Sequence, residues 1–477
     1  MGMGDGDGRP DGARPVAAEV DAATLERACF ELERAQPDRS AKRTFYATQV
    51  IAALSLAGLA GASLSAASAL GLSVLHYAAL TFFAAAIGWR LVAAASSAPI
   101  LSRIAAPKRW PVYTVLCPAY REANVIGDLI ASLGALAYPR HALDVKLLVE
   151  ADDAETTAAA LALAGASNIE VVVVPSCAPR TKPKALNVGL ARARGEYLVV
   201  YDAEDRPHPY QLHAALAAFE DGGARLACVQ APLAIDNPDA SWIAGQFAAE
   251  YAIQFREVLP LLARFRLPLP LGGSSNHFRT DALRAVGGWD PFNVTEDADL
   301  GYRLARDGWL ADMIGPPTYE EAPVTFRAWL AQRTRWIKGH MQTWLVLMRD
   351  PGRTARDMGF PAFLSMQLTL AGGILAALAH GPLALTLVYA ALSPADVLSD
   401  ADFALALSGY ATAGFAALFA SGVTGDLNHA RALATMPVYW PLQSIAACRA
   451  LWDLVLRPHH WSKTTHGVST RPQRMQV

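Results

Sequence analysis

The sequence predicts an α/β catalytic domain inserted between two groups of membrane-spanning helices. Residues 111 to 357 alternate short apolar runs of strand length with helical patterns, which is the order typical of α/β folds. On either side, apolar stretches approach the ~20 residues that cross a bilayer as a helix. The 477 residues are 53% hydrophobic, which leaves room for one sizeable soluble domain and several spans.

Charge and cysteine usage narrow the class of protein further. The chain has 41 basic and 43 acidic residues, and this net charge of -2 argues against nucleic acid as a partner. The 5 cysteines lack the CxxC and CxxH spacings of zinc sites. We therefore predict no zinc site and no disulfide framework, and we interpret every cysteine as a packing residue.

Residues 1–44 are expected to form a disordered tail followed by a short amphipathic helix. Residues 1 to about 20 are rich in Gly, Asp, Pro and Ala and have too few large apolar side chains to offset the entropy of ordering. The run GMGDGDG lacks the flanking strand and helix of a dinucleotide-binding loop. Residues 23–36 follow a helical pattern, and we expect this helix to lie on a membrane or on a partner surface.

Residues 45–98 are predicted to form two transmembrane helices, at about 49–70 and 73–95. Basic residues precede the first stretch and follow the second, whereas the turn between them is uncharged. By the positive-inside rule both flanks lie in the cytoplasm. This pattern predicts a multi-pass protein of the bacterial inner membrane whose catalytic domain is cytoplasmic.

Residues 358–456 are predicted to form about four transmembrane or interfacial helices. The candidates are 360–378, 381–395, 403–423 and 433–455, and the first could lie in the interface instead of spanning. An even number of spans returns the basic residues 457–477 to the cytoplasm as a tail.

Acidic side chains follow two of the predicted strands in the domain 99–357. One strand ends in Asp152 and Asp153, and another ends in Asp202, Glu204 and Asp205. Carboxylates beyond neighbouring strands can coordinate a hard cation such as Mg²⁺ or Mn²⁺, which then completes its shell with substrate phosphates. The alternative for either cluster alone is a solvated loop or a helix N-cap.

Two further elements follow along the chain. In the segment NVTEDADLGYRL, an acid such as Asp297 could act as a general base, or Thr295 and Glu296 could form an ordinary helix cap. In TFRAWLAQRTRWIKGH, Gln332 and the pair Arg335–Trp336 share one helical face. Arg can clamp a diphosphate and Trp can stack on a sugar, although such a helix can also be an interfacial anchor.

In order, these elements resemble the D, DxD, TED and QxxRW motifs of processive family 2 glycosyltransferases, the group of cellulose and hyaluronan synthases. The resemblance covers residues 100 to 350 and implies a GT-A fold, a Rossmann-like cytoplasmic domain between transmembrane helices. The segments DAEDRPHP, GGSSNHFR and GGWDPFNVTEDADLG are similar in sequence to bacterial exopolysaccharide and phage-receptor glycosyltransferases. It implies a hexosyltransferase that requires Mg²⁺ or Mn²⁺.

The resemblance assigns the donor site to several segments. The segment CPAYREANV resembles the loop that receives the nucleotide base, with Pro118, Tyr120 and Glu122 as its contacts. Asp152 and Asp153 then lie near the base and ribose. The resemblance also implies contacts to the diphosphate and the glycan end from Lys182, Gln332, Arg335 and Trp336. It implies metal ligation by Asp202, Glu204 and Asp205.

The acceptor side follows from the same resemblance. It makes Asp297 the catalytic base, with Glu296 and Trp336 at the acceptor. The segment HHWSKTTHG resembles a mobile gating loop, with Trp461, Lys463 and Thr464 as candidates.

These features and the resemblance predict inverting transfer from a nucleotide-sugar, preferably a UDP-sugar, to a growing β-linked glycan that is then moved across the bilayer. The expected partners are the lipid bilayer and an envelope export protein, and no nucleic acid partner is expected. Two alternatives stay open. One is a non-processive transferase that makes a lipid-linked sugar. The other is a catalytically silent envelope scaffold or phage-receptor component.

Overall fold

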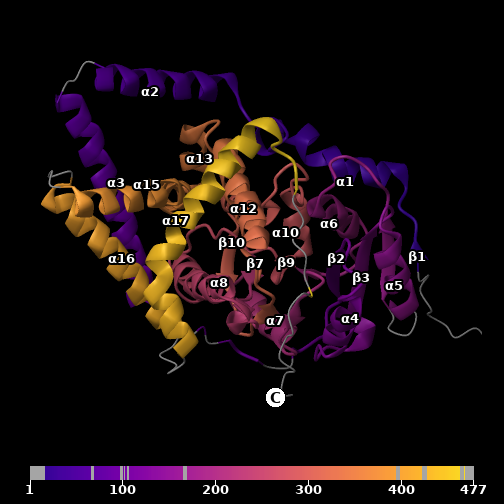
Figure 1. The fold of residues 1–477 in the computed structure, drawn as a ribbon. Coiled ribbons are helices and arrows are strands. Elements are labelled where there is room, and N and C mark those ends of the chain that lie inside the picture. The colour runs from indigo at the N-terminus through magenta and orange to yellow at the C-terminus, as the bar shows by residue number, and fades with distance from the viewer. Residues whose placement is uncertain are drawn as a thin grey trace, which may run out of the picture.

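The computed structural model describes residues 17–461 and Gly467, apart from 66–68, 97–99, 101, 105–106, 165–168, 394–397 and 422–426. The predicted gating residues Lys463 and Thr464 lie outside this part of the chain. Figure 1 shows the two components of the fold, with the sheet on one side and the long helices α3, α15, α16 and α17 gathered on the other.

A mixed sheet of eight described strands forms the centre of the domain, in the order β1-β4-β3-β2-β5-β9-β7-β10. Strand β9 is antiparallel to both β5 and β7, and the other pairs are parallel. The strands are β1 (Ala17–Ala18), β2 (Tyr113–Ala119), β3 (Leu143–Glu150), β4 (Glu170–Val174), β5 (Tyr197–Val200), β7 (Leu226–Gln230), β9 (Asn276–Arg279) and β10 (Leu310–Met313).

A second, three-stranded sheet lies at the strand ends of the first. Its central strand is β11 (Thr318–Glu320), which runs antiparallel to β6 (Arg206–Pro207) and parallel to β8 (Leu233–Ile235). Because β6 directly follows the acidic turn after β5, this small sheet holds that turn in place.

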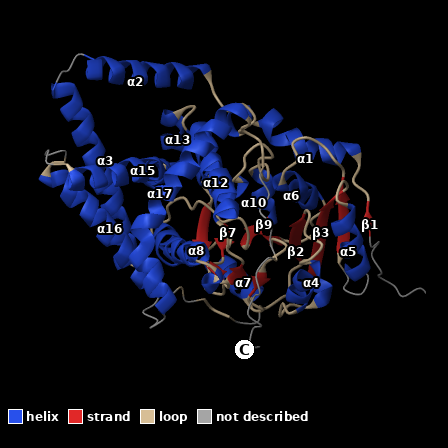
Figure 2. Cartoon of the chain, viewed as in Figure 1, coloured by secondary structure: helices blue, strands red, loops and turns tan. Residues whose placement is uncertain are grey.

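Helices cover both faces of the large sheet (Figure 2). They are α4 (Ile126–Gly134), α5 (Ala154–Ala164), α6 (Lys182–Ala191), α7 (Gln211–Asp221), α8 (Trp242–Ile253), α9 (Leu259–Arg264), α10 (Thr280–Ala285), α11 (Glu296–Arg306), α12 (Phe326–Leu347) and α13 (Pro351–Met358). A π-helical turn, η4 (Gln254–Val258), joins α8 to α9 without a break. Short 3₁₀ turns cover Pro37–Arg39, Arg140–Ala142 and Pro238–Ala240.

The alternation of side chains along the strands builds a core on each face. In β2, Val115 and Cys117 join a cluster with α4, α5 and α7, whereas Leu116 joins a second cluster with α6 and α8. Burial on both faces explains why these strands are short continuous apolar runs in the sequence.

The N-terminal segment is more ordered than the sequence predicts. Ala17 and Ala18 pair with β4 as the edge strand β1, so the described end of the predicted tail belongs to the sheet. Helix α1 (Ala22–Ala35) packs on α6, with Cys29 and Leu32 buried. The prediction that this helix lies on a membrane or partner surface is therefore wrong, because its apolar face is covered by the domain itself.

The apolar segments form long helices whose bounds correct two predictions. Helices α2 (Ala47–Ser65) and α3 (Ala69–Ala95) lie close to the predicted bounds, but the apolar part of α2, Ala47–Ala62, is shorter than the helices that qualify as membrane spans. The predicted segments 360–378 and 381–395 instead form one continuous helical run of α14 (Phe360–Met366), the π-helical turn η5 (Gln367–Ala371) and α15 (Gly372–Leu392). Two more helices follow, α16 (Asp400–Ser421) and α17 (Leu427–Leu456).

Among the described residues, 3 helical segments are long and apolar enough to cross a membrane. They are Ser73–Ala95, Phe360–Leu392 and Asp400–Ala420. Large apolar side chains are exposed along them, including Leu75, Leu385, Leu392 and Leu407. Such a surface is expected where lipid, not water, is the solvent.

Candidate active site

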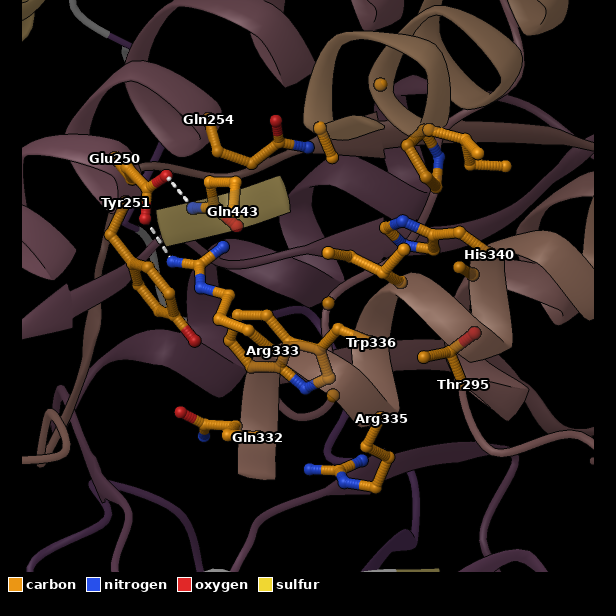
Figure 3. Close-up of a pocket in the computed structure, with 18 of the residues that line it drawn as sticks. Glu250, Tyr251, Gln254, Thr295, Gln332, Arg333, Arg335, Trp336, His340 and Gln443 are labelled. Carbon is orange, nitrogen blue, oxygen red and sulfur yellow. Dashed lines mark hydrogen bonds and ion pairs between the residues drawn. The ribbon is translucent and has the colours of Figure 1, made fainter. Parts of the chain in front are cut away.

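One cavity of about 1310 Å³ collects most of the predicted site residues. Its wall includes the loops that follow β2, β3 and β5, the N-terminal ends of α6 and α11, and helix α12. Asp202 and Asp297 both line this cavity, although 95 positions separate them in the sequence. Figure 3 shows residues of α8, α12 and α17 that converge on its middle part.

The acidic turn after β5 places Asp202 against a lysine. Lys182, the first residue of α6, lies with its Nζ 2.5 Å from Asp202 Oδ1 and donates a hydrogen bond of 2.7 Å to the carbonyl oxygen of Gly273. Burial lowers the pKa of Lys182, but the carboxylates of Asp202, Glu296 and Asp297 outweigh this and raise it above the usual range. A permanently charged ammonium therefore faces the cavity.

Asp297 approaches the neighbouring glycine, Gly273, as well. A Cβ placed on Gly273 would be 3.3 Å from Asp297 Oδ2 and 3.9 Å from Asp202 Oδ2. The other oxygen, Asp297 Oδ1, accepts a hydrogen bond of 2.7 Å from the backbone N–H of Ala298. This bond fixes the carboxylate and leaves Oδ2 directed toward Gly273. The absence of a side chain at Gly273 keeps the space between the two carboxylates open.

The first turn of α11 is electrostatically strained. Burial and then the neighbouring Asp297 raise the pKa of Glu296 to about 7, and burial raises the pKa of Asp297 as well. Lys182 and Arg335 act in the opposite direction on Asp297. A carboxylate whose pKa is raised toward neutrality is a better proton acceptor, which suits a general base.

Thr295 does not cap α11 through its side chain, so the simple capping box is not what the segment TED forms. Instead Thr295 packs against α12, where a Cβ on Gly339 would lie 2.3 Å from Thr295 Oγ1. Only a glycine at position 339 permits this close approach. The contact sets the distance between the acids of α11 and the cations of α12.

Helix α12 presents the QRTRW sequence to the cavity, as Figure 3 shows. Arg335 donates a hydrogen bond to Val294 O over 3.3 Å, and its guanidinium lies 5.4 Å from the ring centre of Trp461. Arg335 Nε and Gln332 Oε1 are buried without a hydrogen-bond partner among the described residues. Unpaired buried polar atoms in a cavity wall are the atoms expected to bind a ligand.

Trp336 sits in an aromatic corner of the cavity. Its ring lies 5.6 Å from the ring of Phe247 and 6.2 Å from that of Tyr251, both on α8. The guanidinium of Arg333 lies 4.9 Å from the centre of the Trp336 ring. These contacts fix the indole as a flat apolar wall on which a sugar ring can stack.

The loop after β2 also reaches the cavity. Pro118, Tyr120 and Glu122 line it, and Glu122 Oε2 accepts a hydrogen bond of 3.2 Å from the backbone N–H of Tyr120. Asp152 lines it as well and forms an ion pair of 2.8 Å with Arg180. These positions agree with a binding place for a nucleotide.

Two of the predicted site residues point elsewhere. Asp153 is buried and accepts hydrogen bonds from the backbone N–H groups of Thr156 and Arg121, so it caps α5 and holds the loop after β2. Asp205 Oδ2 accepts a bond of 2.8 Å from the N–H of Asp202, which closes their own turn. Neither residue lines the cavity. In this structure the side chains of Asp153 and Asp205 therefore bond to the backbone and do not face the space in which a nucleotide or a metal would bind.

A metal ion would find few protein ligands here. Asp202 and Glu204 line the cavity, but the described residues contain no group of three or more His, Cys, Asp or Glu side chains arranged around one point. Mg²⁺ commonly uses one or two carboxylates and completes its shell with water and phosphate oxygens. Burial, with contributions from Glu204 and Asp202, raises the pKa of Glu320 to about 8. The three carboxyl groups of Asp202, Glu204 and Glu320 fit a cation that binds together with the diphosphate of the substrate.

Sequence reasoning missed a second network on α12. Arg333, a spacer in the QxxRW motif, forms an ion pair with Glu250 of α8. Glu250 also accepts hydrogen bonds of 2.8 Å from Tyr439 Oη and 3.0 Å from Gln443 Nε2, both on α17. The network ties three helices at the wall of the cavity. The available clue in the sequence was Glu250, the one acidic residue within the otherwise uncharged segment of α8.

The first residues of the predicted gating segment, His459 to Trp461, dock onto the domain. Lys338 donates hydrogen bonds to His460 O over 2.7 Å and to Arg457 O over 3.2 Å. His459 contacts the carbonyl oxygen of Phe292 at 2.9 Å through Nδ1. Trp461 therefore reaches the cavity, where it faces Arg335.

The far end of the cavity lies among the long apolar helices. Its wall there comes from α3, α15, α16 and α17, with Phe83, Ile87, Leu383, Leu405 and Ala406 among the lining residues. A single cavity thus connects a charged end at the sheet with an apolar end between candidate membrane spans.

Three comparisons with known proteins bear on this site. Residues 111–339 match the sequence model of the family described as glycosyltransferase like family 2. The chain is 28% identical over 285 residues to a β-monoglucosyldiacylglycerol synthase of Synechocystis sp., which covers 57% of each protein. It is 26% identical over 240 residues to a probable glucomannan 4-β-mannosyltransferase of Oryza sativa, which covers 48% of this chain and 40% of that one.

Among solved structures, a mannosyltransferase of Pyrobaculum calidifontis in complex with GDP-Man and Mn²⁺ aligns with a TM-score of 0.48 and 19% identity, over 81% of this chain and 97% of that one. The chain spans 57% of the length of the Synechocystis relative. The matched range 111–339 contains β2 through most of α12, and so includes the loops, acids and QRTRW residues described above. This chain carries a glycosyltransferase domain of family 2.

Proposed function

We propose that the chain transfers a sugar from a nucleotide-sugar to an acceptor hydroxyl, with inversion at the anomeric carbon. The observation that carries this proposal is the placement of Asp297 Oδ2 and Asp202 Oδ2 around Gly273, in one cavity with Lys182 and Arg335. Acids and cations in this arrangement provide a base for the acceptor and positive charge for a leaving diphosphate.

The steps follow from the chain's own residues. Tyr120 and Asp152 hold the nucleotide, and Lys182 and Arg335 balance the charge of the diphosphate. Asp297 Oδ2 takes the proton from the acceptor hydroxyl as its oxygen attacks the anomeric carbon and the bond to the diphosphate breaks. Mg²⁺ or Mn²⁺ held by Asp202 and Glu204 would neutralise charge on the departing phosphate. We infer a UDP-sugar as the donor from the resemblance.

The acceptor is proposed to be a growing β-linked glycan, which would leave through the end of the cavity between α3, α15 and α16 at a bacterial inner membrane. The continuity of the cavity from Asp297 to these helices supports this route. A lipid hydroxyl is the second candidate. The apolar lining at that end favours it, and so does the match to a β-monoglucosyldiacylglycerol synthase.

The variant Asp297→Asn tests the base. We expect transfer to fall by roughly 10³-fold while nucleotide binding persists, because the amide keeps the shape but accepts no proton. Turnover within about tenfold of the wild type would overturn the assignment. The wild-type products from radiolabelled UDP- and GDP-sugars distinguish the acceptors, since a polymer supports the glycan and a single sugar on lipid supports the alternative.

A further inference from the structure

A buried carboxyl group that the proposed reaction does not use lines the same cavity. Glu257 belongs to the π-helical turn η4, and only 1% of its surface is exposed. Neither carboxyl oxygen has a hydrogen-bond partner among the described residues. Natural proteins rarely bury a polar group in this way, and π-helical turns occur frequently at functional sites. We therefore expect the carboxyl group of Glu257 to bind a ligand.

The turn η4 links the reacting end of the cavity to the apolar helices. On one side, the ring of Phe255 packs so closely that a Cβ on Gly272 would lie 3.0 Å from it, next to Gly273 of the catalytic loop. On the other side, Arg256 donates a hydrogen bond of 2.9 Å to Ala420 O of α16. The turn also contacts α3. Glu257 is thus held between the base and the apolar end.

The chemistry of the position selects the kind of ligand. The described residues hold no group of three or more His, Cys, Asp or Glu side chains that includes Glu257, so a bound cation has little support. Burial raises the pKa of Glu257 to about 7, which keeps much of it in the neutral acid form. A neutral carboxyl both donates and accepts a hydrogen bond, as an alcohol does. A hydroxyl group on an otherwise apolar neighbour is its natural partner.

We propose that Glu257 binds a hydroxyl of the acceptor other than the one that reacts, and that this contact determines which acceptors are used. The inference rests on the proposed function, because it adds a second contact to the acceptor of that site. A sugar unit of a glycan offers such a second hydroxyl, whereas diacylglycerol has only the hydroxyl that would react. The inference therefore applies to a sugar acceptor.

The test uses the full chain in nanodiscs with the variants Glu257→Leu and Glu257→Gln. We expect Leu to raise the acceptor KM by about tenfold or more, because it offers no hydrogen bond, and Gln to stay within about threefold of the wild type. Donor KM and the slow hydrolysis of donor by water should stay within about twofold in both. An unchanged acceptor KM in the Leu variant, or a parallel loss of donor hydrolysis, overturns the proposal.

Two controls exclude a purely structural effect. Leu at position 257 removes an unpaired buried acid, so the Tm should hold or rise, and a fall in Tm together with the change in KM would overturn the inference. The matched variant Glu155→Leu changes an exposed acid of α5 outside the cavity and should leave every kinetic constant unchanged.

A binding experiment without donor separates this inference from the catalytic proposal. Tryptophan fluorescence would follow a soluble β-linked oligosaccharide and, separately, diacylglycerol in nanodiscs. We expect Glu257→Leu to weaken binding of the oligosaccharide by about tenfold and to leave binding of diacylglycerol unchanged, because diacylglycerol has no second hydroxyl. Equal affinities of variant and wild type for the oligosaccharide would refute the contact, whereas wild-type binding without any turnover would refute only the catalysis.

Discussion

The two ends of the cavity are built from different parts of the chain by different rules. At the charged end, Lys182, Asp202 and Asp297 are set by loops and helix starts at the edge of a rigid sheet, and hydrogen bonds fix them. At the apolar end, side chains such as Phe83 and Leu405 come from long helices that pack on one another. The charged end holds the groups that can take part in a reaction, whereas the apolar end mainly determines the shape of the cavity.

The difference between the two ends predicts that substitutions at each end impair different activities. A change at the charged end should affect donor and acceptor reactions together, because both pass through the same charges. A change at the apolar end should affect only the acceptor. Measuring transfer to acceptor and hydrolysis of donor side by side tests this division.

Removing a cation from the charged end should have the largest effect. Arg335→Ala is expected to lower both transfer and donor hydrolysis by roughly 10²-fold, because Glu296 and Asp297 lose a partner and the diphosphate loses a donor. Arg335→Lys should recover only part of the loss, since an ammonium cannot bind in two places at once. If hydrolysis survives in Arg335→Ala, the two ends are not divided as described.

Filling the apolar end should have a smaller and more selective effect. Ala406 of α16 lines the cavity there, and Ala406→Trp adds bulk without adding charge. We expect transfer to fall by about tenfold and donor hydrolysis to stay within about twofold. Val438→Trp, on an exposed surface of α17, provides the control. Equal loss of both activities would contradict the division.

The close contact between α11 and α12 should respond through stability. Gly339→Ala places a methyl group against Thr295, and overpacking of this kind costs about 1–3 kcal/mol. The Tm should fall by several degrees. Gly127→Ala on α4, where a Cβ meets nothing within 4 Å, should leave the Tm unchanged or raise it.

The smallest effect is a pH dependence at the charged end. The folded state holds the proton of Glu296 more tightly than the unfolded chain, because its pKa is raised to about 7. Its contribution to stability is therefore present at acid pH and is lost as the pH rises from the ordinary value of 4.5 to about 7. Glu296→Gln should flatten the Tm profile over that window. A parallel profile in the variant would assign the dependence to another group.

Sequence reasoning succeeded where a local pattern fixes the structure. Short apolar runs predicted the main strands of the sheet, and the ends of those runs predicted Asp202 and Asp152 at the cavity. It failed where the partner is distant. In the sequence Asp153 looks like a ligand, but in the structure it caps α5. Asp205 also looks like a ligand, but it accepts a hydrogen bond from the backbone of its own turn.

The helical segments teach the same lesson. The sequence predicted separate segments at 360–378 and 381–395, yet 360–392 forms one continuous helical run with Pro382 inside it. Near this proline, Ser444 of α17 accepts a hydrogen bond of 2.7 Å from the N–H of Gly381, so a neighbouring helix supports the run. The contact of Arg333 with Glu250 could not be predicted, since no local spacing relates two residues 83 positions apart.

The docking of residues 457–461 on α12 has a consequence for folding. Trp461 contributes to the wall beside Arg335, and Lys338 donates hydrogen bonds to the carbonyl groups of Arg457 and His460. Because these residues directly follow α17, which itself packs on α12, the wall beside Arg335 forms together with the packing of the long helices. A disturbance of α17 should therefore reach the charged end of the cavity without any change in the sheet.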